Sequence, residues 1–276
     1  MDLAAEIERN VRAALAEDVG SGDLTAPLIP SGKRARAAVL CRRPAVLCGQ
    51  PWFEACLSHV DRSATVSWTM AEGADVPAGT RVCMIDAEAR ALLAGERVAL
   101  NFLQTLSGVA TVARRYVEAI AGTRARIVDT RKTLPGLRLA QKYAVRIGGG
   151  SNHRIGLYDA MLIKENHIAA AGGVRQAIEQ AKKLKNKGDW IQVEVESLDQ
   201  LREALDAGAS MILLDNMTVG QMREAVKISA GRAELEASGG ITLENARAIA
   251  ETGVDRMSVG SLTKDLKAAD FSMRFE

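Results

Sequence analysis

The spacing of hydrophobic residues changes twice within the first 120 residues of the chain. Apolar residues recur every three or four positions from Leu3 to Glu17, which predicts an amphipathic helix. From Lys33 to about Asp86 the pattern becomes short β-like runs separated by Gly and Pro. A long helical stretch follows, from about Glu88 to Ile120, and we expect it to be loosened near Ser107-Gly108. The pattern therefore places helices on both sides of a group of short strands.

Strand-like runs and helical patterns alternate through the second half of the chain. The six runs are Arg126–Val128, Ala160–Ile163, Ile191–Val193, Met211–Leu214, Ala233–Leu235 and Arg256–Val259. Strands that alternate with helices imply a parallel sheet with right-handed crossovers. Six such units within about 150 residues favour a (β/α) barrel over an open sheet.

Polar or charged residues follow every one of these six runs. They are Asp129–Thr133, Lys164–His167, Glu194 with Glu196, Asp215–Asn216, Ser238–Gly240 and Gly260–Ser261. The catalytic groups of such barrels project from the carboxyl ends of the strands. We therefore expect these residues to surround one mouth, with Gly148–Gly150 opening a loop that carries Asn152–Arg154 into it.

The positive residues expected at this mouth predict a strongly anionic ligand. They are Arg131, Lys132, His153, Arg154 and Lys164. Several positive charges in one partly dry cavity repel each other unless an anion is bound, and arginine suits bidentate contact with carboxylate or phosphate. Arg138, Lys142 and Arg146 lie on the following helix, where simple solvation is the alternative.

The glycines and acids of the mouth add two further features. Ser238-Gly239-Gly240 and Gly260-Ser261 each follow a strand and precede a helix, which favours a phosphate site over turns that are merely tight. Glu194 and Asp215 can bind a divalent metal, hold sugar hydroxyls or offset positive charge in a transition state. For Glu196, an outward-facing or helix-capping role is equally open. No Ser or Cys pairs with a His, so a covalent nucleophile is not indicated.

Composition narrows the class of protein. With 47% hydrophobic and 25% charged residues the chain is an ordinary globular protein, and a net charge of +2 excludes a nucleic-acid binder that relies on bulk positive charge. No run approaches the roughly 18 apolar residues of a membrane span, and the acidic start of the chain does not resemble a secretory signal. The 4 cysteines form no CxxC pair, which favours reduced thiols and a cytoplasmic location.

Several motifs together resemble the quinolinate phosphoribosyltransferase family, also called decarboxylating nicotinate-nucleotide pyrophosphorylase. They are Asp129–Arg138, Lys142–Val145, Gly148–Arg154, Leu162–His167, Glu17–Thr25 and Glu96–Leu103. The likeness extends over nearly the whole chain. The departures are conservative, such as Ser151 where Ala is common and Thr105 at a position that usually has a longer side chain.

The resemblance implies a fold and a reaction. The fold is α/β, with an N-terminal α/β sandwich at 1–105, an open TIM-like (β/α) barrel at 106–267, and a tail, 268–276, that returns to the first domain. The reaction is that of a type II phosphoribosyltransferase, a pentosyltransferase of de novo NAD synthesis. It converts quinolinate and phosphoribosyl pyrophosphate to nicotinate mononucleotide, pyrophosphate and carbon dioxide, with Mg²⁺ and no organic cofactor. The expected partners are these small molecules and a second copy of the chain in a homodimer or higher oligomer, without nucleic acid or membrane.

The resemblance also implies residue roles. Arg131, His153 and Arg154 resemble the family's quinolinate-binding residues, and Lys132 and Lys164 resemble its catalytic lysines facing pyrophosphate and the substrate carboxylates. Glu194 and Asp215 match acids near the ribose and the metal, which they reach through water or substrate. The substrate-binding set is completed by Thr130, Ser238, Gly239, Gly240, Val259, Gly260, Ser261 and Lys264, and by Arg97, which enters the active site of the neighbouring subunit.

Two alternative functions remain at this point. A paralogue of the same fold, associated with molybdate transport, would keep the barrel and phosphate loops but would not bind quinolinate. A non-catalytic metabolite-binding barrel would not need both the acids at 194 and 215 and the phosphate loops.

Overall fold

The computed structural model describes residues 3–185 and 189–276, and the chain forms two compact units. The first unit comprises Met1–Arg114, Thr133–Gly149 and Leu262–Glu276, and the second comprises Arg115–Lys132 and Gly150–Ser261. These units differ in extent from the two domains expected from the family resemblance. Helix α3 (Ala89–Ala119) runs unbroken through the expected boundary at 105, and helix α4 (Arg138–Ile147) belongs to the first unit.

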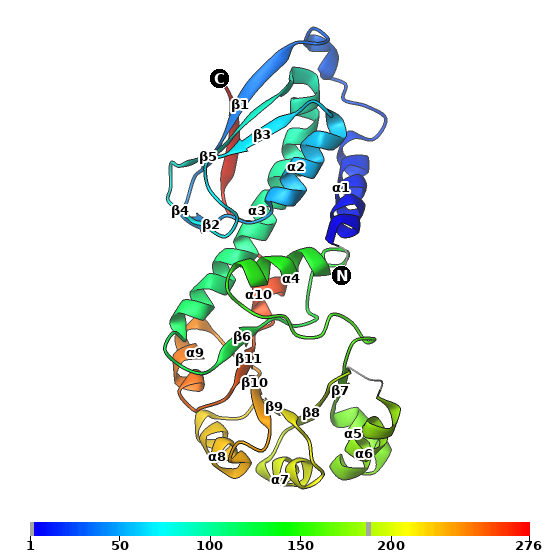
Figure 1. Cartoon of the computed structure of the whole chain (residues 1–276), viewed down its shortest axis with the longest axis vertical. Coiled ribbons are helices and arrows are strands. Elements are labelled where there is room, and N and C mark those ends of the chain that lie inside the picture. The colour runs from blue at the N-terminus through cyan, green and yellow to red at the C-terminus, as the bar shows by residue number, and fades with distance from the viewer. Residues whose placement is uncertain (1–2, 186–188) are drawn as a thin grey trace. The chain divides into compact units, whose positions relative to one another are not determined.

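The first unit contains an antiparallel sheet in the strand order β12-β1-β5-β3 (Figure 1). Its strands are β1 (Arg34–Cys41), β3 (Thr65–Trp68), β5 (Arg81–Glu88) and β12 (Phe271–Phe275). A separate two-stranded sheet pairs β2 (Ala45–Val46) with β4 (Asp75–Val76). Strand β12 lies along β1, with Phe271 opposite Cys41 and Phe275 opposite Ala37, so the C-terminal residues are part of this sheet.

The helices of the first unit cover this sheet and complete its core. They are α1 (Leu3–Val19), the 3₁₀ turn η1 (Ala26–Leu28), α2 (Gln50–Val60), most of α3, α4 and α10 (Ser261–Lys264). Helix α10 begins at the last residue of the second unit. Val39 and Ile85 of the sheet and Phe53 and Leu92 of the helices are buried. The Trp52 indole N–H donates to Asn10 Oδ1 at 3.0 Å, which satisfies the one polar atom of that buried ring.

The expected loosening of the long helix at Ser107-Gly108 is wrong, because α3 is continuous there. The Ser107 hydroxyl instead bonds to the backbone N–H and C=O of Cys48, at 2.9 and 3.0 Å. A Cβ atom at Gly108 would lie 2.4 Å from the carbonyl oxygen of Lys267. The small residues therefore allow a close approach of two chain segments and do not weaken the helix.

The second unit is built on a six-stranded parallel sheet in the order β6-β11-β10-β9-β8-β7. The strands are β6 (Arg126–Val128), β7 (Met161–Ile163), β8 (Ile191–Val195), β9 (Met211–Asp215), β10 (Glu234–Ser238) and β11 (Arg256–Ser258). They correspond to the six predicted runs. Because β6 and β7 are the two edges, the described part of the barrel is open between them, and the predicted open TIM-like barrel is confirmed.

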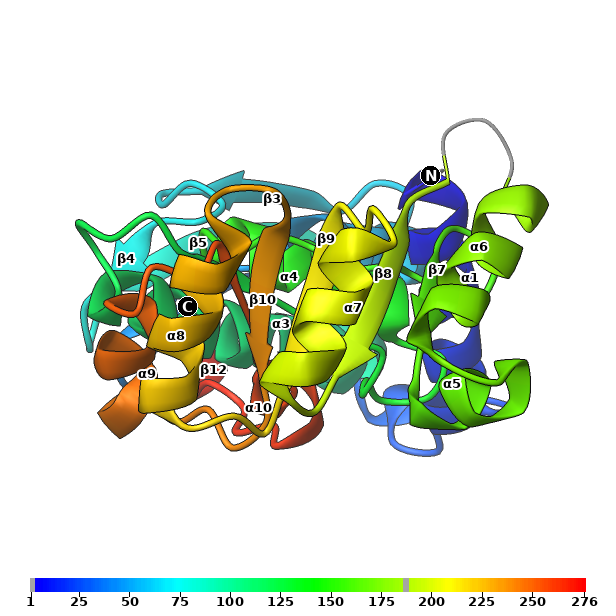
Figure 2. The same ribbon diagram turned by 90° about the horizontal axis from the view of Figure 1, so that it is seen from below.

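Helices cover the outer side of this curved sheet (Figures 1 and 2). They are α5 (Glu165–Ala171), α6 (Val174–Leu184), α7 (Leu198–Asp206), α8 (Val219–Ser229) and α9 (Leu243–Ala250). Among the described residues, no helix is long and apolar enough to span a bilayer.

Candidate active site

The parallel register brings the carboxyl ends of the strands of the second unit into one row. Ser238 is paired with Asp215 of β9 and with Ser258 of β11, and Ser258 is paired with Val128 of β6. The segments that follow these residues therefore leave the sheet side by side. They carry the predicted residues Thr130, Arg131, Lys132, Asp215, Ser238, Gly239, Gly240, Val259, Gly260 and Ser261.

Lys164, Glu194 and Asp215 form a charged cluster at this edge. Ile163 is paired with Val193, so Lys164 and Glu194 follow in register, and Lys164 Nζ lies 3.4 Å from Glu194 Oε2. Burial raises the pKa of the Glu194 carboxyl; the Lys164 ammonium lowers it, and the nearby Asp215 carboxylate raises it further. The site thus holds an ion pair of Lys164 with Glu194, and a second carboxylate, Asp215, lies close enough to act on Glu194.

Two guanidinium groups lie close enough at this edge to repel each other. Arg154 is buried, at 8% exposure, and its Nη1 donates to the Ala160 carbonyl at 3.2 Å. Burial lowers the pKa of Arg154, the charge of Arg131 lowers it further, and Asp159 opposes both effects. A bound dianion would relieve both the burial cost and the repulsion.

The segment that carries Arg154 is fixed against strand β6. Ser151 forms a parallel bridge to Val128, at the open edge of the sheet. The carboxylate of Asp129, which is fully buried, accepts hydrogen bonds from Asn152 Nδ2 at 2.6 Å and from the His153 backbone N–H at 2.9 Å. The predicted loop into the mouth is therefore a segment held by a buried carboxylate.

Both ring nitrogens of His153 are engaged by protein groups. Nδ1 accepts the Arg154 backbone N–H at 2.8 Å, and Nε2 lies 3.0 Å from Gln192 Oε1. His153 is buried, at 7% exposure. The imidazole thus has partners inside the unit at the two atoms with which it could hold a substrate carboxylate.

The glycine loops leave room for neighbouring side chains. A Cβ at Gly239, where φ is +95°, would lie 2.1 Å from Asn216 Oδ1. Asn216 itself has a φ of 52°, and its Nδ2 donates to Asp215 Oδ2 at 2.8 Å. A Cβ at Gly260 would lie 3.1 Å from Lys132 Cδ. Lys132 therefore lies against the Gly260 loop.

Some predicted residues do not belong to this edge. Arg97 on α3 and Lys264 on α10 are in the first unit, as are the three basic residues of α4, and Lys142 is nearly fully buried there. Glu196 lies beyond the end of β8 and is exposed. The outward-facing alternative for Glu196 thus fits its position.

Sequence reasoning missed two buried polar residues of the second unit, Gln192 and Glu236, and it placed Asp129 at the mouth without a specific role. Gln192 and Glu194 alternate with valines in β8, and Glu236 lies between Leu235 and Ala237 in β10. Such isolated polar residues at alternate positions of a buried strand are the signal that points into a barrel interior.

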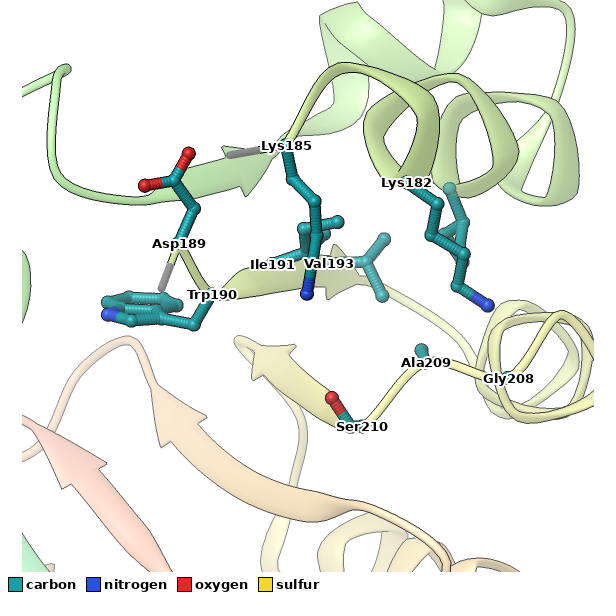
Figure 3. Close-up of a pocket in the computed structure, with 10 residues that line it drawn as sticks. Lys182, Lys185, Asp189, Trp190, Ile191, Val193, Gly208, Ala209 and Ser210 are labelled. Carbon is teal, nitrogen blue, oxygen red and sulfur yellow. The ribbon is translucent and has the colours of Figure 1, made fainter. Parts of the chain in front are cut away.

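A cavity of about 170 Å³ lies at the opposite, amino-terminal ends of β8 and β9 (Figure 3). Lys182 of α6, Trp190 before β8 and Ser210 before β9 are among its lining residues, and Lys182 Nζ donates to the Ala207 carbonyl at 2.7 Å. Because catalytic groups of barrels lie at the carboxyl ends of the strands, we assign this cavity no part in the reaction.

An open parallel barrel whose carboxyl edge joins paired guanidiniums, acids and glycine loops defines an enzyme that acts on anionic substrates. Family models of the N-terminal and C-terminal domains of quinolinate phosphoribosyl transferase match residues 23–107 and 109–274. The chain belongs to the quinolinate phosphoribosyltransferase family, so the resemblance inferred from the motifs is confirmed.

Individual relatives agree with this assignment. A probable nicotinate-nucleotide pyrophosphorylase of Bacillus subtilis is 41% identical over 257 residues, covering 93% of this chain and 89% of the relative. The nicotinate-nucleotide pyrophosphorylase of Mycobacterium leprae is 42% identical, covering 95% of both chains. The solved structure of the nicotinate-nucleotide pyrophosphorylase from Francisella tularensis has a TM-score of 0.95 at 44% identity, covering 99% of this chain and 96% of that one. These names support neither the molybdate-associated paralogue nor the non-catalytic barrel.

We expect Gly239→Ala to destabilise the second unit more than Gly240→Ala. Both positions have positive φ, so each alanine carries about 1–2 kcal/mol of backbone strain. Only the Cβ at 239 also collides with Asn216, whereas nothing lies within 4 Å of one at 240, and overpacking adds about 1–3 kcal/mol. The free energies of unfolding of both variants, measured in urea, test this difference. Equal losses would mean that Asn216 does not pack against Gly239.

Proposed function

We propose that the protein transfers the phosphoribosyl group of phosphoribosyl pyrophosphate to quinolinate, giving nicotinate mononucleotide, pyrophosphate and carbon dioxide in NAD biosynthesis. The relatives are named nicotinate-nucleotide pyrophosphorylase [carboxylating] or quinolinate phosphoribosyltransferase [decarboxylating], which describe one reaction read in its two directions. The single observation that carries the proposal is the buried Arg154 guanidinium beside Arg131. Such a pair fits a ligand with two adjacent carboxylates.

Arg131 and Arg154 hold the quinolinate carboxylates, and Lys164 contributes a third positive charge. Bidentate contacts would fix the plane of the pyridine ring and so aim its nitrogen at the ribose. The nearness of Lys164 to Glu194 supports this arrangement, because it places a carboxylate-binding cation next to the acid assigned to the ribose.

The two glycine loops hold the 5-phosphate of phosphoribosyl pyrophosphate, and Lys132 faces its pyrophosphate. The proposed phosphate donors are the backbone amides of two loops, with Thr130 as an additional contact. The loops are Ser238–Gly240 and Val259–Ser261. Positive φ at Gly239 and Gly240 supports this role, since it turns successive amides toward one side of the chain. The position of Lys132 against Gly260 supports the placement of both phosphate groups at neighbouring loops.

The donor set of the site fits a magnesium ion that arrives with the substrate. No group of three or more potential ligands occurs among the described residues, and Glu194 and Asp215 supply two carboxylates. Mg²⁺ commonly uses one or two carboxylates together with phosphate oxygens and water. When bound, the ion would neutralise charge on the departing pyrophosphate, and Glu194 and Asp215 would hold it through water or substrate.

The chain's own residues act by positioning and electrostatics. The quinolinate nitrogen attacks the anomeric carbon while pyrophosphate leaves, so positive charge builds up on the ribose, and the carboxylates of Glu194 and Asp215 stabilise that charge. Lys132 stabilises the negative charge on the leaving group. The product of transfer has a quaternary ring nitrogen next to a carboxylate, so carbon dioxide departs and the positive nitrogen stabilises the electron pair left behind until a proton is taken up.

We further propose that the enzyme is a cytoplasmic homodimer in which Arg97 of one subunit completes the site of the other. The four cysteines are all free and buried thiols, as is usual in a reducing compartment. Arg97 is exposed on α3, so its charge is available to a partner. A two-fold interface would supply the residue reciprocally.

We expect the purified protein to form nicotinate mononucleotide from quinolinate, phosphoribosyl pyrophosphate and Mg²⁺, and to use nicotinate poorly. Nicotinate has one carboxylate and leaves a guanidinium unpaired, which costs about 1.5–3 kcal/mol. Arg154→Ala should raise the quinolinate KM by about tenfold or more for the same reason. Product formation followed by chromatography measures both effects, with Arg202→Ala on the exposed face of α7 as the control. Equal use of the two pyridine acids would rule out the proposed specificity.

Arg97→Ala and Lys164→Ala should each be nearly inactive alone and should complement each other when mixed. A mixed dimer has both lesions in one site and neither in the other, so at most about half of its sites work. The matched control mixes Lys164→Ala with Glu194→Ala. These two residues touch within one subunit, so every site of that mixed dimer keeps a lesion. Recovery in the first mixture alone supports the shared site; background activity after demonstrated subunit exchange contradicts it.

A further inference from the structure

A chain of buried polar side chains crosses the interior of the second unit and ends at His153. Arg256 Nε lies 3.3 Å from Glu236 Oε2, and Gln192 Nε2 donates to the same oxygen at 3.1 Å. Gln192 Oε1 in turn lies 3.0 Å from His153 Nε2. Glu236 and Gln192 have no exposed surface. None of the steps proposed above uses either residue.

The hydrogen bonds of this chain have one consistent direction. At one end, His153 Nδ1 faces the Arg154 backbone N–H, which can only donate, so the ring proton must be on Nε2. At the other end, an ionised Glu236 can only accept, so Gln192 must turn its amide N–H₂ toward Glu236 and its oxygen toward His153. The two ends therefore specify the same imidazole tautomer independently.

Further contacts hold this arrangement in place. Burial is the largest influence on the Glu236 carboxyl and raises its pKa; the Arg256 guanidinium, 3.3 Å away, opposes this effect, and its position beside Oε2 supports the accept-only carboxylate. The second oxygen of Glu236 lies 3.5 Å from His153 Nε2 and is a buried atom without a hydrogen-bond partner among the described residues, so a further acceptor faces this nitrogen. Trp190 packs edge-on against the imidazole, with ring centroids 5.1 Å apart.

We propose that Glu236 and Gln192 are positioning residues for the carboxylate substrate: they keep His153 as its Nε2–H tautomer, and His153 thereby fixes the backbone of Arg154. This inference rests on the proposed role of Arg154 in binding quinolinate. It adds a positioning task to the substrate-binding role that the family resemblance implies for His153.

The physical reason is the cost of keeping Arg154 in place. Its guanidinium is buried and is repelled by Arg131, so the segment that carries it must be held by other contacts. With the proton on Nδ1, the ring N–H and the Arg154 N–H would point at each other. The backbone would then move, and the guanidinium would lose its bond to the Ala160 carbonyl. A buried N–H without an acceptor costs about 1–3 kcal/mol, enough to shift such a segment.

The first test reads the tautomer directly in the wild-type protein without ligand. The chain has 3 histidines, and His59 and His167 are exposed, so three ring signals are expected in a long-range ¹H–¹⁵N spectrum. At a pH of about 8, above the usual pKa of imidazole, we expect His153 to show a protonated Nε2 and an unprotonated Nδ1. A proton on Nδ1, or on both nitrogens, contradicts the proposal. This measurement does not depend on quinolinate.

The second test changes the direction of the hydrogen bonds among His153, Gln192 and Glu236 while conserving the shapes of the side chains. In Glu236→Gln, the group at 236 can donate or accept, so Gln192 is free to turn and the tautomer is no longer specified. The double variant Gln192→Glu/Glu236→Gln exchanges the two groups and restores an accept-only oxygen next to Nε2. Glu234→Gln is the matched control, because it removes a carboxylate two residues away on the same strand that also pairs with Arg256, at 3.9 Å, but does not bond to Gln192.

We expect Glu236→Gln to mix the His153 tautomers and to raise the quinolinate KM about tenfold, with kcat and the KM for phosphoribosyl pyrophosphate little changed. The exchanged double variant should recover both the tautomer and the quinolinate KM, and Glu234→Gln should match the wild type.

A normal quinolinate KM in a Glu236→Gln protein with mixed tautomers overturns the positioning role. Equal loss of kcat and of affinity for both substrates, with a lowered Tm, indicates a merely structural role and also overturns it. If wild-type His153 has the expected tautomer but the protein does not bind quinolinate, the proposed function is what fails.

Discussion

The buried carboxylate of Asp129 is the contact on which the arrangement of the anion-binding residues depends. It follows β6, a strand at one edge of the described sheet, and accepts hydrogen bonds from Asn152 and from the His153 backbone. Because the sheet is open at β6, the segment around Ser151 can pair with that strand where a closed barrel would have another strand. Hydrogen bonds to a charged acceptor contribute about 1.5–3 kcal/mol each, which can fix a segment that no regular strand supports.

Around this contact, the site combines groups that are unfavourable together until substrate is present. Arg154 is buried near Arg131, and Glu194 is partly buried near Asp215, so both pairs lower the stability of the empty site. A ligand that brings negative charge to the first pair and developing positive charge to the second compensates both. Preorganised charges of this kind need no reorganisation as the reaction proceeds, and they act most strongly where water is excluded.

The sequence predicted the features that depend on hydrophobic periodicity and on the direction of the strands, namely the secondary structure and the edge at which the strands end. Alternating strands and helices identified the parallel barrel, and the rule that strands end at one edge grouped Lys164, Glu194 and Asp215, of which Lys164 and Glu194 form an ion pair. It could not predict partners that depend on three-dimensional distance. Ser107-Gly108 looked like a weak point of a helix, because the carbonyl of Lys267 that needs the space is remote in sequence.

The buried partners of His153 illustrate the same limit. Gln192 and Glu236 are separated from His153 by 39 residues or more, and no local pattern links them. The motif around residues 152–154 suggested a substrate-binding histidine but gave no sign that protein groups face both of its ring nitrogens. Which ring nitrogen of a histidine carries the proton depends on the groups that face the two nitrogens. Sequence spacing identifies neither of these groups.

Asp129 holds the segment that carries Arg154, and hydrogen–deuterium exchange of the Asp129→Asn variant tests this role. Asparagine keeps the shape of the side chain but removes its charge and presents N–H₂ in place of one accepting oxygen, so Asn152 and the His153 N–H both lose a charged acceptor. The account predicts faster amide exchange confined to residues 150–154, unchanged exchange in β8, β9 and β10, and about tenfold weaker binding of quinolinate. Unchanged exchange in 150–154, or faster exchange spread evenly over the whole second unit, would contradict it.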